Sequence, residues 1–335
     1  MHTVVIARNA MATRFEIVVQ GDDPVRLRAA AEEALEEIER LESKLSLFQP
    51  TSELSAVNAR AAYEPVRVTP ELFRLLEHSR RMSIETGGAF DPTIAPLMRL
   101  WGFTQGSGLV PDAAQLEATR AKIGMDRVEL NAADFTVHFP VEGMRLDLGA
   151  IGKGFALDQA ADILREAGVN RALLHGGTST VYALGRPFDA DFWKVAVPYP
   201  QLPASNDAEQ ELAVARMHFG EATDESILAV IALENESLSV SAPAGKFFLA
   251  EGKSFGHVLD PRTGHPVQGA WLAAVVLPSA TETDALSTAL LTVGPDGFEA
   301  FAGLRPGMKS LVVGNRGEGE LWNVKSRGIE LQKAK

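Results

Sequence analysis

The stretch "DLGAIGKGFALD" (residues 147–158) places an acidic residue at the end of an expected strand and three glycines around one lysine before an expected helix. Such a turn can hold an anion, because a flexible backbone opens a helix N-terminus and Lys153 adds a mobile positive charge. Its spacing matches neither a P-loop nor the GxGxxG fingerprint. Two interpretations therefore stay open: an anion or nucleotide site, and a tight strand-to-helix turn with a solvated lysine.

The composition describes a globular chain without cysteine chemistry. With 335 residues, 46% hydrophobic and 23% charged, the chain can form one large domain or two ordinary ones. The formal net charge of −12 argues against a surface that follows nucleic acid or anionic lipid. Without cysteine there are no disulfides, thiolate metal sites or cysteine nucleophile, so oxygen and imidazole remain as metal ligands.

The N-terminal residues lack the basic and apolar regions of a signal peptide, and no later run is long enough to span a bilayer. The chain as it stands, with neither signal peptide nor lipobox cysteine, is expected in the cytoplasm. If a longer N-terminus precedes it, a periplasmic or membrane-anchored protein is expected instead.

Hydrophobic patterns predict helices and strands that do not alternate strictly, which favours an α+β or mixed α/β fold over a Rossmann sheet. Helices are expected after an N-cap at Asp23, over 70–88, over about 154–167 and over 281–292. Strands are expected at 13–20, 126–130, 135–139, 144–148, 171–175, 192–198, 227–234, 271–278 and 310–314. We expect a single domain over 1–325, with a surface loop or insertion at about 199–226 and a C-terminal tail at 326–335.

The stretch "SATETDALSTALLTVG" (279–294) places Asp284 and Thr288 one turn apart on an expected helix. A carboxylate and a hydroxyl on one face suit a hard cation such as Mg²⁺, completed by a carbonyl, phosphate oxygens and water. The alternative is an Asp that complements the helix dipole and a Thr that bonds back to the helix backbone.

Two further stretches carry polar groups beside proline turns. In "ETGGAFDPTIAPLMRLWGF" (85–103), Asp91 precedes Pro92, which predicts either a projecting ligand or an Asx-turn next to an aromatic cluster of Phe90, Trp101 and Phe103. In "GKSFGHVLDPRTGHPV" (252–267), His257 precedes an Asp-Pro turn, and His265 is a competing candidate for the same role.

Taken together and in this order, the four stretches resemble the ApbE family of FAD:protein FMN transferases. The likeness runs from about residue 11 to about residue 313 and includes "LSLFQPTSELSAVN" (45–58) and "SLSVSAPAGKFF" (237–248). It implies an ApbE-like mixed α/β fold with two intimately packed halves around a central cleft. It also implies Mg²⁺-dependent cleavage of the FAD pyrophosphate, attachment of FMN to a threonine of an acceptor flavoprotein of the Nqr, Rnf or a related type, and release of AMP.

The resemblance also implies roles for individual residues. Asp284, Thr288 and the carbonyl of Ala150 would hold Mg²⁺, and His257 and Asp284 would be catalytic, with His257 as the base for the incoming hydroxyl. The FAD-contacting positions would be Met11, Phe48, Ala89, Phe90, Asp91, Asp147, Lys153 and Val258.

Two stretches depart from the family pattern. The chain has "LHGGT" (174–178) where the family usually carries Asn-x-Gly-Gly, and "VSAPA" (240–244) where Thr-Ser-Gly-x-Tyr is common. The second change removes a tyrosine from a loop near the presumed ligand. Three activities therefore stay open: flavin transfer to protein, Mg²⁺-dependent hydrolysis of FAD to FMN and AMP, and non-catalytic FAD binding.

Overall fold

A computed structural model of the chain describes residues 1–200, 227–243, 247–250, 253–316 and 322–332. One large antiparallel sheet dominates it, in the order β1-β2-β6-β7-β10-β13-β14-β15. Its strands are β1 (His2–Ala10), β2 (Thr13–Gly21), β6 (Ala172–Gly176), β7 (Thr180–Leu184), β10 (Glu236–Ser241), β13 (Ala270–Leu277), β14 (Lys309–Arg316) and β15 (Trp322–Arg327).

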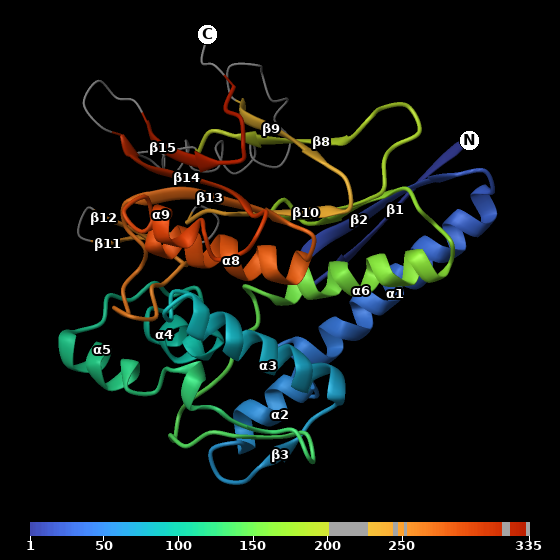
Figure 1. The fold of residues 1–335 in the computed structure, drawn as a ribbon. Coiled ribbons are helices and arrows are strands. Elements are labelled where there is room, and N and C mark those ends of the chain that lie inside the picture. Colours follow the sequence, from blue (N-terminus) through green and yellow to red (C-terminus); the bar gives the residue numbers. More distant parts are fainter. Residues whose placement is uncertain (201–226, 244–246, 251–252, 317–321, 333–335) are drawn as a thin grey trace.

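Three long helices cover one face of this sheet, and a pair of strands lies over the other face (Figure 1). The helices are α1 (Pro24–Leu45), α6 (Gly152–Glu166) and α8 (Ala280–Val293), and the strands are β8 (Trp193–Pro198) and β9 (Ile227–Leu233). The expected α+β class is confirmed, because the strands pair antiparallel and the long helices gather on one face.

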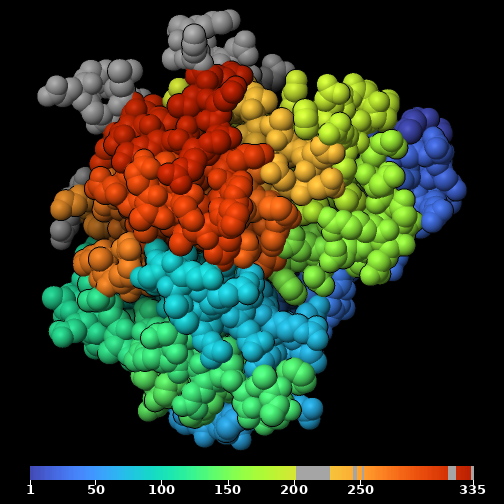
Figure 2. Space-filling view, viewed as in Figure 1, coloured from blue at the N-terminus to red at the C-terminus, as the bar shows by residue number. Residues whose placement is uncertain are grey.

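A second part of the molecule lies beyond the helix layer and is formed mostly by residues 50–150 (Figures 1 and 2). Its helices are α2 (Glu53–Arg60), α3 (Pro70–Glu85), α4 (Ala95–Leu100) and α5 (Ala113–Arg120), with the 3-10 turns η1 (Pro92–Ile94) and η2 (Met125–Arg127). Its small sheet has the order β3-β5-β4, from β3 (Val66–Arg67), β5 (Thr136–His138) and β4 (Glu129–Asn131). The hairpin of β11 (Phe247–Ala250) and β12 (Lys253–Gly256) and the short α9 (Phe298–Phe301) complete the described elements.

The core follows from the alternation of side chains along the strands. Phe15, Ile17 and Val19 of β2 are 0% exposed and belong to the core that includes α1, α6 and α8. Val18 points the other way, into a second core under β8 and β9. The buried side chains of α3 share the first core, so the two parts of the molecule are packed through one hydrophobic interior.

Most predicted elements are present. The helix predicted after Asp23 is α1, and the Asp23 carboxylate accepts hydrogen bonds from the N–H groups of Val25 and Arg26 at 3.0 and 3.1 Å, as an N-cap should. Strand β1 was not predicted. The predicted loop at 199–226 and tail at 326–335 lie partly outside the described residues, although Ile329 is buried and the N–H of Gln332 donates to Leu228.

The strand predicted at 144–148 is wrong, because the backbone there is paired in another way. The side chain of Asn58 both accepts from the N–H of Leu146 at 2.6 Å and donates to its carbonyl at 2.9 Å. The N–H of Asp147 donates to the carbonyl of Pro92 at 2.7 Å. An amide side chain and a turn carbonyl thus take the place of a neighbouring strand.

Helices α6 and α8 approach each other so closely that one residue must be glycine. A Cβ placed on Gly154 would lie 2.1 Å from the carbonyl oxygen of Ala280 and 2.8 Å from Cβ of Asp284. Both atoms belong to α8, and one of them is backbone. A rotamer change of a neighbour therefore cannot make room for a Cβ at position 154. Gly154 is therefore a packing residue.

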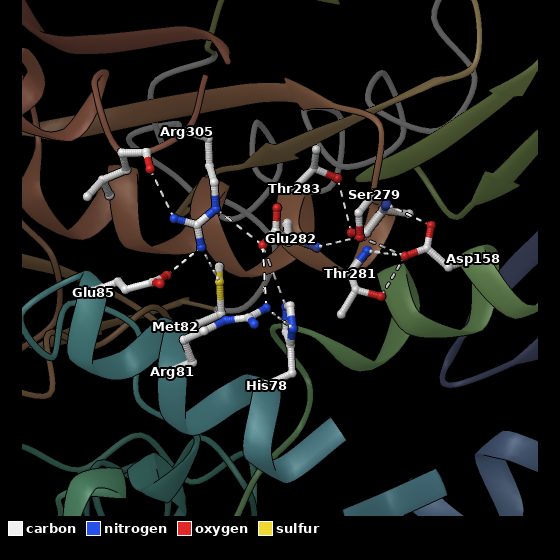
Figure 3. A network of polar contacts seen from close by, with 12 residues as sticks. His78, Arg81, Met82, Glu85, Asp158, Ser279, Thr281, Glu282, Thr283 and Arg305 are labelled. Carbon is white, nitrogen blue, oxygen red and sulfur yellow. Dashed lines mark hydrogen bonds and ion pairs between the residues drawn. The ribbon is translucent and has the colours of Figure 1, made fainter. Parts of the chain in front are cut away.

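The N-terminus of α8 is capped by a carboxylate from α6. Asp158 accepts hydrogen bonds from the N–H groups of Ala280 and Thr281 at 2.8 and 2.9 Å and from the hydroxyls of Ser279 and Thr281 at 2.9 and 2.6 Å. Figure 3 shows this group beside a second network on the same helix, in which Glu282 faces Arg305, His78 and Arg81.

That second network ties α3 to α8. Arg305 Nε lies 3.2 Å from Glu282 Oε1, and its guanidinium also pairs with Glu85 at the end of α3 (Figure 3). The imidazole of His78 lies 3.9 Å from the same Glu282 oxygen. Charged contacts at the edge of the shared core thus fix α3 relative to α8.

Among the described residues, none of the helices combines the length and the apolar composition that a membrane crossing requires.

Gly154→Ala is expected to lower the free energy of unfolding by about 3 kcal/mol, the upper end for an overpacked core. Gly152→Ala is the matched control, since a Cβ there would meet nothing within 4 Å, and alanine is the better helix former. Urea unfolding of the two variants measures the difference. Equal stability of both would mean that the close contact of α6 with α8 is not what requires glycine at 154.

Candidate active site

Four segments far apart in the sequence meet beside α8. They are the glycine-lysine turn (147–158), the Asp-Pro turn (85–103), the histidine hairpin (252–267) and the α8 segment (279–294). These are the four stretches that the sequence singled out, and each touches another one through a hydrogen bond or ion pair.

The contacts form a ring. The Asp147 N–H bond to Pro92 joins the glycine-lysine turn to the Asp-Pro turn. The indole N–H of Trp101 donates to the carbonyl of Gly264 at 2.8 Å, which joins the Asp-Pro turn to the histidine hairpin. Arg262 of that hairpin reaches the carbonyl of Thr292 at 3.5 Å, on the α8 segment.

The ring closes where Asp284 of the α8 segment forms an ion pair with Lys153 of the glycine-lysine turn. Asp284 has a side chain only 5% exposed, and its Oδ1 lies 3.4 Å from the ammonium of Lys153. Oδ2 accepts the backbone N–H of Gly154 at 3.0 Å, and Oδ1 accepts the hydroxyl of Thr180 at 3.3 Å. Three donors thus compensate a buried carboxylate for its lost hydration.

The glycine-lysine turn leads into a helix N-terminus that is already occupied. The N-terminus of α6 does hold an anion, and that anion is the protein's own Asp284, bound to the N–H of Gly154. Lys153 is not extended into solvent, because its ammonium also donates to the carbonyl of Gly149 at 3.1 Å and its side chain is 21% exposed. The turn therefore presents a lysine and carbonyl groups next to a carboxylate.

Thr288 lies one turn after Asp284 on the same face of α8. Its hydroxyl is 3.3 Å from the carbonyl of Asp284 and 3.2 Å from the hydroxyl of Ser241. The back-bond to the helix is the arrangement that the alternative interpretation predicted. Ala150 lies in the turn directly after Gly149 and packs, half-buried, against the core.

The donor set around Asp284 is made of oxygen: one carboxylate, a hydroxyl and turn carbonyls. The described residues contain no group of three or more His, Cys, Asp or Glu side chains that could hold a metal ion. This chemistry fits a hard cation such as Mg²⁺, and only if phosphate oxygens and water complete the coordination, as is usual for Mg²⁺.

Both carboxylate oxygens of Asp91 accept hydrogen bonds from neighbouring parts of the fold. Oδ1 accepts the N–H and the hydroxyl of Thr93 at 2.8 and 2.5 Å, and Oδ2 accepts the N–H of Met125 at 2.9 Å and the hydroxyl of Ser83 at 3.2 Å. Burial raises the pKa of the Asp91 carboxyl, against the opposing effect of these hydrogen bonds. The Asx-turn interpretation therefore describes what this side chain does here.

The neighbours of Asp91 are also turned inward. Ala89 and Phe90 are 1% and 2% exposed and belong to the main core. The predicted aromatic cluster is therefore wrong for Phe90, whereas Trp101 and Phe103 pack in a separate cluster with Phe248 and Phe255. The separation follows from the turn at Pro92, after which the chain leaves the core.

His257 follows β12 and is half-buried in the histidine hairpin. That hairpin is braced by other groups: Asp260 accepts two hydrogen bonds of 2.9 Å from the Arg262 guanidinium, and Trp101 bonds Gly264. His265 is exposed. The neighbouring Val258 is part-buried, and its carbonyl accepts the N–H of Val267 at 2.9 Å.

The remaining predicted FAD-contacting residues lie on other elements. Met11 lies in the β1–β2 turn with φ of 49°, followed by Ala12 at 58°, a left-handed pair that non-glycine residues rarely adopt. Backbone strain of this kind clusters at functional sites. Phe48, between α1 and α2, is 68% exposed.

The altered stretch "VSAPA" touches two parts of the site. The hydroxyl of Ser241 bonds those of Ser287 and Thr288 on α8. Pro243 packs against Gly256, the residue before His257, where an added Cβ would lie 2.9 Å from Pro243 Cβ. Ala244 lies outside the described residues.

Sequence reasoning missed Thr180 and Asp158. Each interacts with a residue more than a hundred positions away, Asp284 and the start of α8 respectively. Asp158 is even part of the stretch quoted first, yet nothing local marks it as the cap of another helix. The packing of α6 on α8 gives Asp158 its role, and the packing of β7 against α8 gives Thr180 its role.

Fold and site together define an α+β protein in which a buried aspartate pairs with a lysine where four segments converge. The model of the ApbE family matches residues 11–312. The chain belongs to the ApbE family.

Individual relatives agree over most of the chain. A protein of Treponema pallidum named FAD:protein FMN transferase is 29% identical over 86% of this chain and 77% of its own length. One of Haemophilus influenzae with the same name is 27% identical over 87% of this chain and 81% of its own. The crystal structure of the ApbE protein of Thermotoga maritima matches with a TM-score of 0.81 at 26% identity, covering 98% of this chain and 97% of that one. By the names of its relatives, the family is one of transferases.

Asp91→Asn is expected to lower the free energy of unfolding by about 1–3 kcal/mol, because an amide has a single acceptor oxygen and leaves a buried donor unpaired. Asp126→Asn, at an exposed position on η2, is the control. Urea unfolding and FAD fluorescence titration separate the two roles. A variant of normal stability that fails to bind FAD would make Asp91 a ligand-binding residue instead.

Proposed function

We propose that this protein is a Mg²⁺-dependent FAD:protein FMN transferase. It binds FAD, cleaves its pyrophosphate, attaches FMN through a phosphoester bond to a threonine of an acceptor flavoprotein and releases AMP. The names of the relatives support flavin transfer to protein. Mg²⁺, the threonine acceptor, its Nqr, Rnf or related type and AMP release are part of the proposal, which takes them from the resemblance; the oxygen ligands of the site support Mg²⁺.

The convergence of Lys153 and Asp284 on the glycine-lysine turn carries the proposal. A pyrophosphate bears about two negative charges, and its transfer depends mainly on positioning and charge stabilisation. Lys153 offers one positive charge, which is already near a carboxylate in an acidic protein. The site therefore suits a pyrophosphate bound to a cation better than a pyrophosphate without one.

Each residue has a task in this proposal. Asp284, Thr288 and the carbonyl of Ala150 would hold Mg²⁺, which supplies charge neutralisation and Lewis acidity to the phosphates when bound. Lys153 orients the phosphate oxygens, and Met11, Phe48, Asp147 and Val258 lie on the segments that would surround the nucleotide. Asp91, Ala89 and Phe90 shape the adjacent turn from inside the core.

The transfer step is a substitution at phosphorus. The acceptor hydroxyl oxygen forms a bond to the FMN phosphorus, the bridging P–O bond breaks, and the bridging oxygen leaves with AMP. His257 accepts the proton of the hydroxyl. Asp260, Arg262 and Trp101 hold the shape of the hairpin that carries His257, which supports a fixed position for this base.

Incubation with FAD, Mg²⁺ and an acceptor domain, followed by intact-mass measurement of every species, tests the activity. Transfer adds the mass of FMN to the acceptor and yields AMP. Free FMN and AMP with an unmodified acceptor would indicate a hydrolase, and unchanged FAD would indicate a binding protein.

Asp284→Ala is expected to abolish transfer in this assay while the protein stays folded, because the only carboxylate of the proposed metal site is removed. Asp296→Ala, an exposed carboxylate just beyond α8, removes the same charge and should transfer normally. Circular dichroism checks the fold of both. Normal turnover of the Asp284 variant at ordinary Mg²⁺ would contradict the metal assignment.

His257→Ala is expected to slow single-turnover transfer by about 10²–10⁴-fold, the usual contribution of a general base, with FAD affinity unchanged. His265→Ala, an exposed histidine of the same hairpin, is the control. If the folded, FAD-saturated His257 variant transfers at the parental rate, another group takes the proton.

A further inference from the structure

A row of buried hydroxyl groups lies between the sheet and α8, next to Asp284. Thr180 of β7, Ser237 and Ser239 of β10, and Thr283 of α8 are all 0% exposed. A buried hydroxyl without a partner is costly, so such a row persists only where each group has a defined hydrogen bond. The directions of these bonds show what the row does.

Three of the hydroxyls place their single proton within the row or on the backbone. Ser237 donates to the carbonyl of Val181 at 2.8 Å, and Thr283 donates to the carbonyl of Ala280 at 3.0 Å. Ser239 donates to the hydroxyl of Thr283 at 2.9 Å, a shorter contact than its 3.3 Å approach to Thr180.

The proton of Thr180 goes to Asp284. Its hydroxyl lies 3.3 Å from Oδ1, and an ionised carboxylate has no proton to donate, so Thr180 is the donor of this pair. The other oxygen, Oδ2, is held by the N–H of Gly154 at 3.0 Å. One donor from the sheet and one from α6 thus fix the two oxygens of a carboxylate that α8 carries.

We propose that Thr180 is a positioning residue that sets the orientation of Asp284 for metal binding. Ser239 lies 3.3 Å from the Thr180 hydroxyl and pairs with Thr180 across β10 and β7, so the orientation is anchored in the sheet. Thr180 itself contacts neither metal nor substrate. The inference rests on the proposed function, because it assigns to Asp284 the part of a metal ligand. Partners of this kind around a ligand typically change metal affinity by about 10- to 100-fold when removed.

The hydroxyl can be isolated with two variants that differ only by that group, Thr180→Ser and Thr180→Ala. Thr180→Val keeps the side-chain volume, and Ser239 retains Thr283 as a partner in each variant. Ser237→Ala is the matched control, since it removes a hydroxyl of the same row that bonds Val181 and Thr283.

Electron paramagnetic resonance counts free Mn²⁺, used here as the probe for the Mg²⁺ site, during titration of each full-length variant with ADP present. The same titration without protein is subtracted, because ADP itself binds Mn²⁺. Thr180→Val and Thr180→Ala are expected to bind Mn²⁺ about 10- to 100-fold more weakly than the parent. Thr180→Ser and Ser237→Ala should bind within about threefold of the parent. Melting curves identify the variants that fold. If Thr180→Val does not fold, the Mn²⁺ affinities of Thr180→Ser and Thr180→Ala are compared instead.

Two results would overturn the inference and leave the proposed function intact. One is equal Mn²⁺ affinity of the folded Thr180→Ala variant and the parent, and the other is a Thr180→Ser variant as weak as Thr180→Ala. If the parent binds no Mn²⁺, or Asp284→Ala binds it as well as the parent, the proposed metal site itself is wrong.

Discussion

The close contact of α6 with α8 is the constraint on which the site depends. Backbone meets backbone at Gly154, where no side chain larger than hydrogen fits against Ala280. Two carboxylates cross this contact in opposite directions: Asp158 of α6 caps α8, and Asp284 of α8 binds the N–H of Gly154. Each helix thus satisfies backbone donors at the start of the other, which fixes their relative position at both ends of the contact.

This arrangement couples the fold to the candidate chemistry. The N–H of Gly154 that orients Asp284 is the kind of donor that binds phosphate at other helix N-termini. Here it is occupied by a side chain, so Gly154 serves helix packing rather than a phosphate cradle. The ammonium of Lys153 is a donor suited to a nucleotide phosphate, and the carbonyls of the turn are acceptors suited to a cation.

The sequence predicted the parts of the molecule that local patterns determine. The N-cap at Asp23, the strand at 13–20 and the α8 segment follow from side-chain periodicity and capping chemistry, and the structure confirms them. The strand expected at 144–148 failed because Asn58, almost ninety residues earlier, pairs with its backbone. The roles of Asp158 and Thr180 depend on helix and sheet packing, so no local pattern could reveal them.

The same distinction explains why the four candidate stretches were found although their contacts were not. Each carries a local irregularity, such as a proline turn, a glycine pair or a polar residue in an apolar helix, and irregular backbone is where sites are built.

Within the proposed function, the position of Lys153 depends on whether the metal is bound. Its ammonium and a divalent cation cannot both stay against Oδ1 of Asp284, since like charges at such a distance repel. Binding of the metal therefore releases the lysine, and a phosphate beside the turn gives the displaced ammonium a new partner. Metal and nucleotide should accordingly favour each other's binding, because each removes a charge imbalance that the other creates.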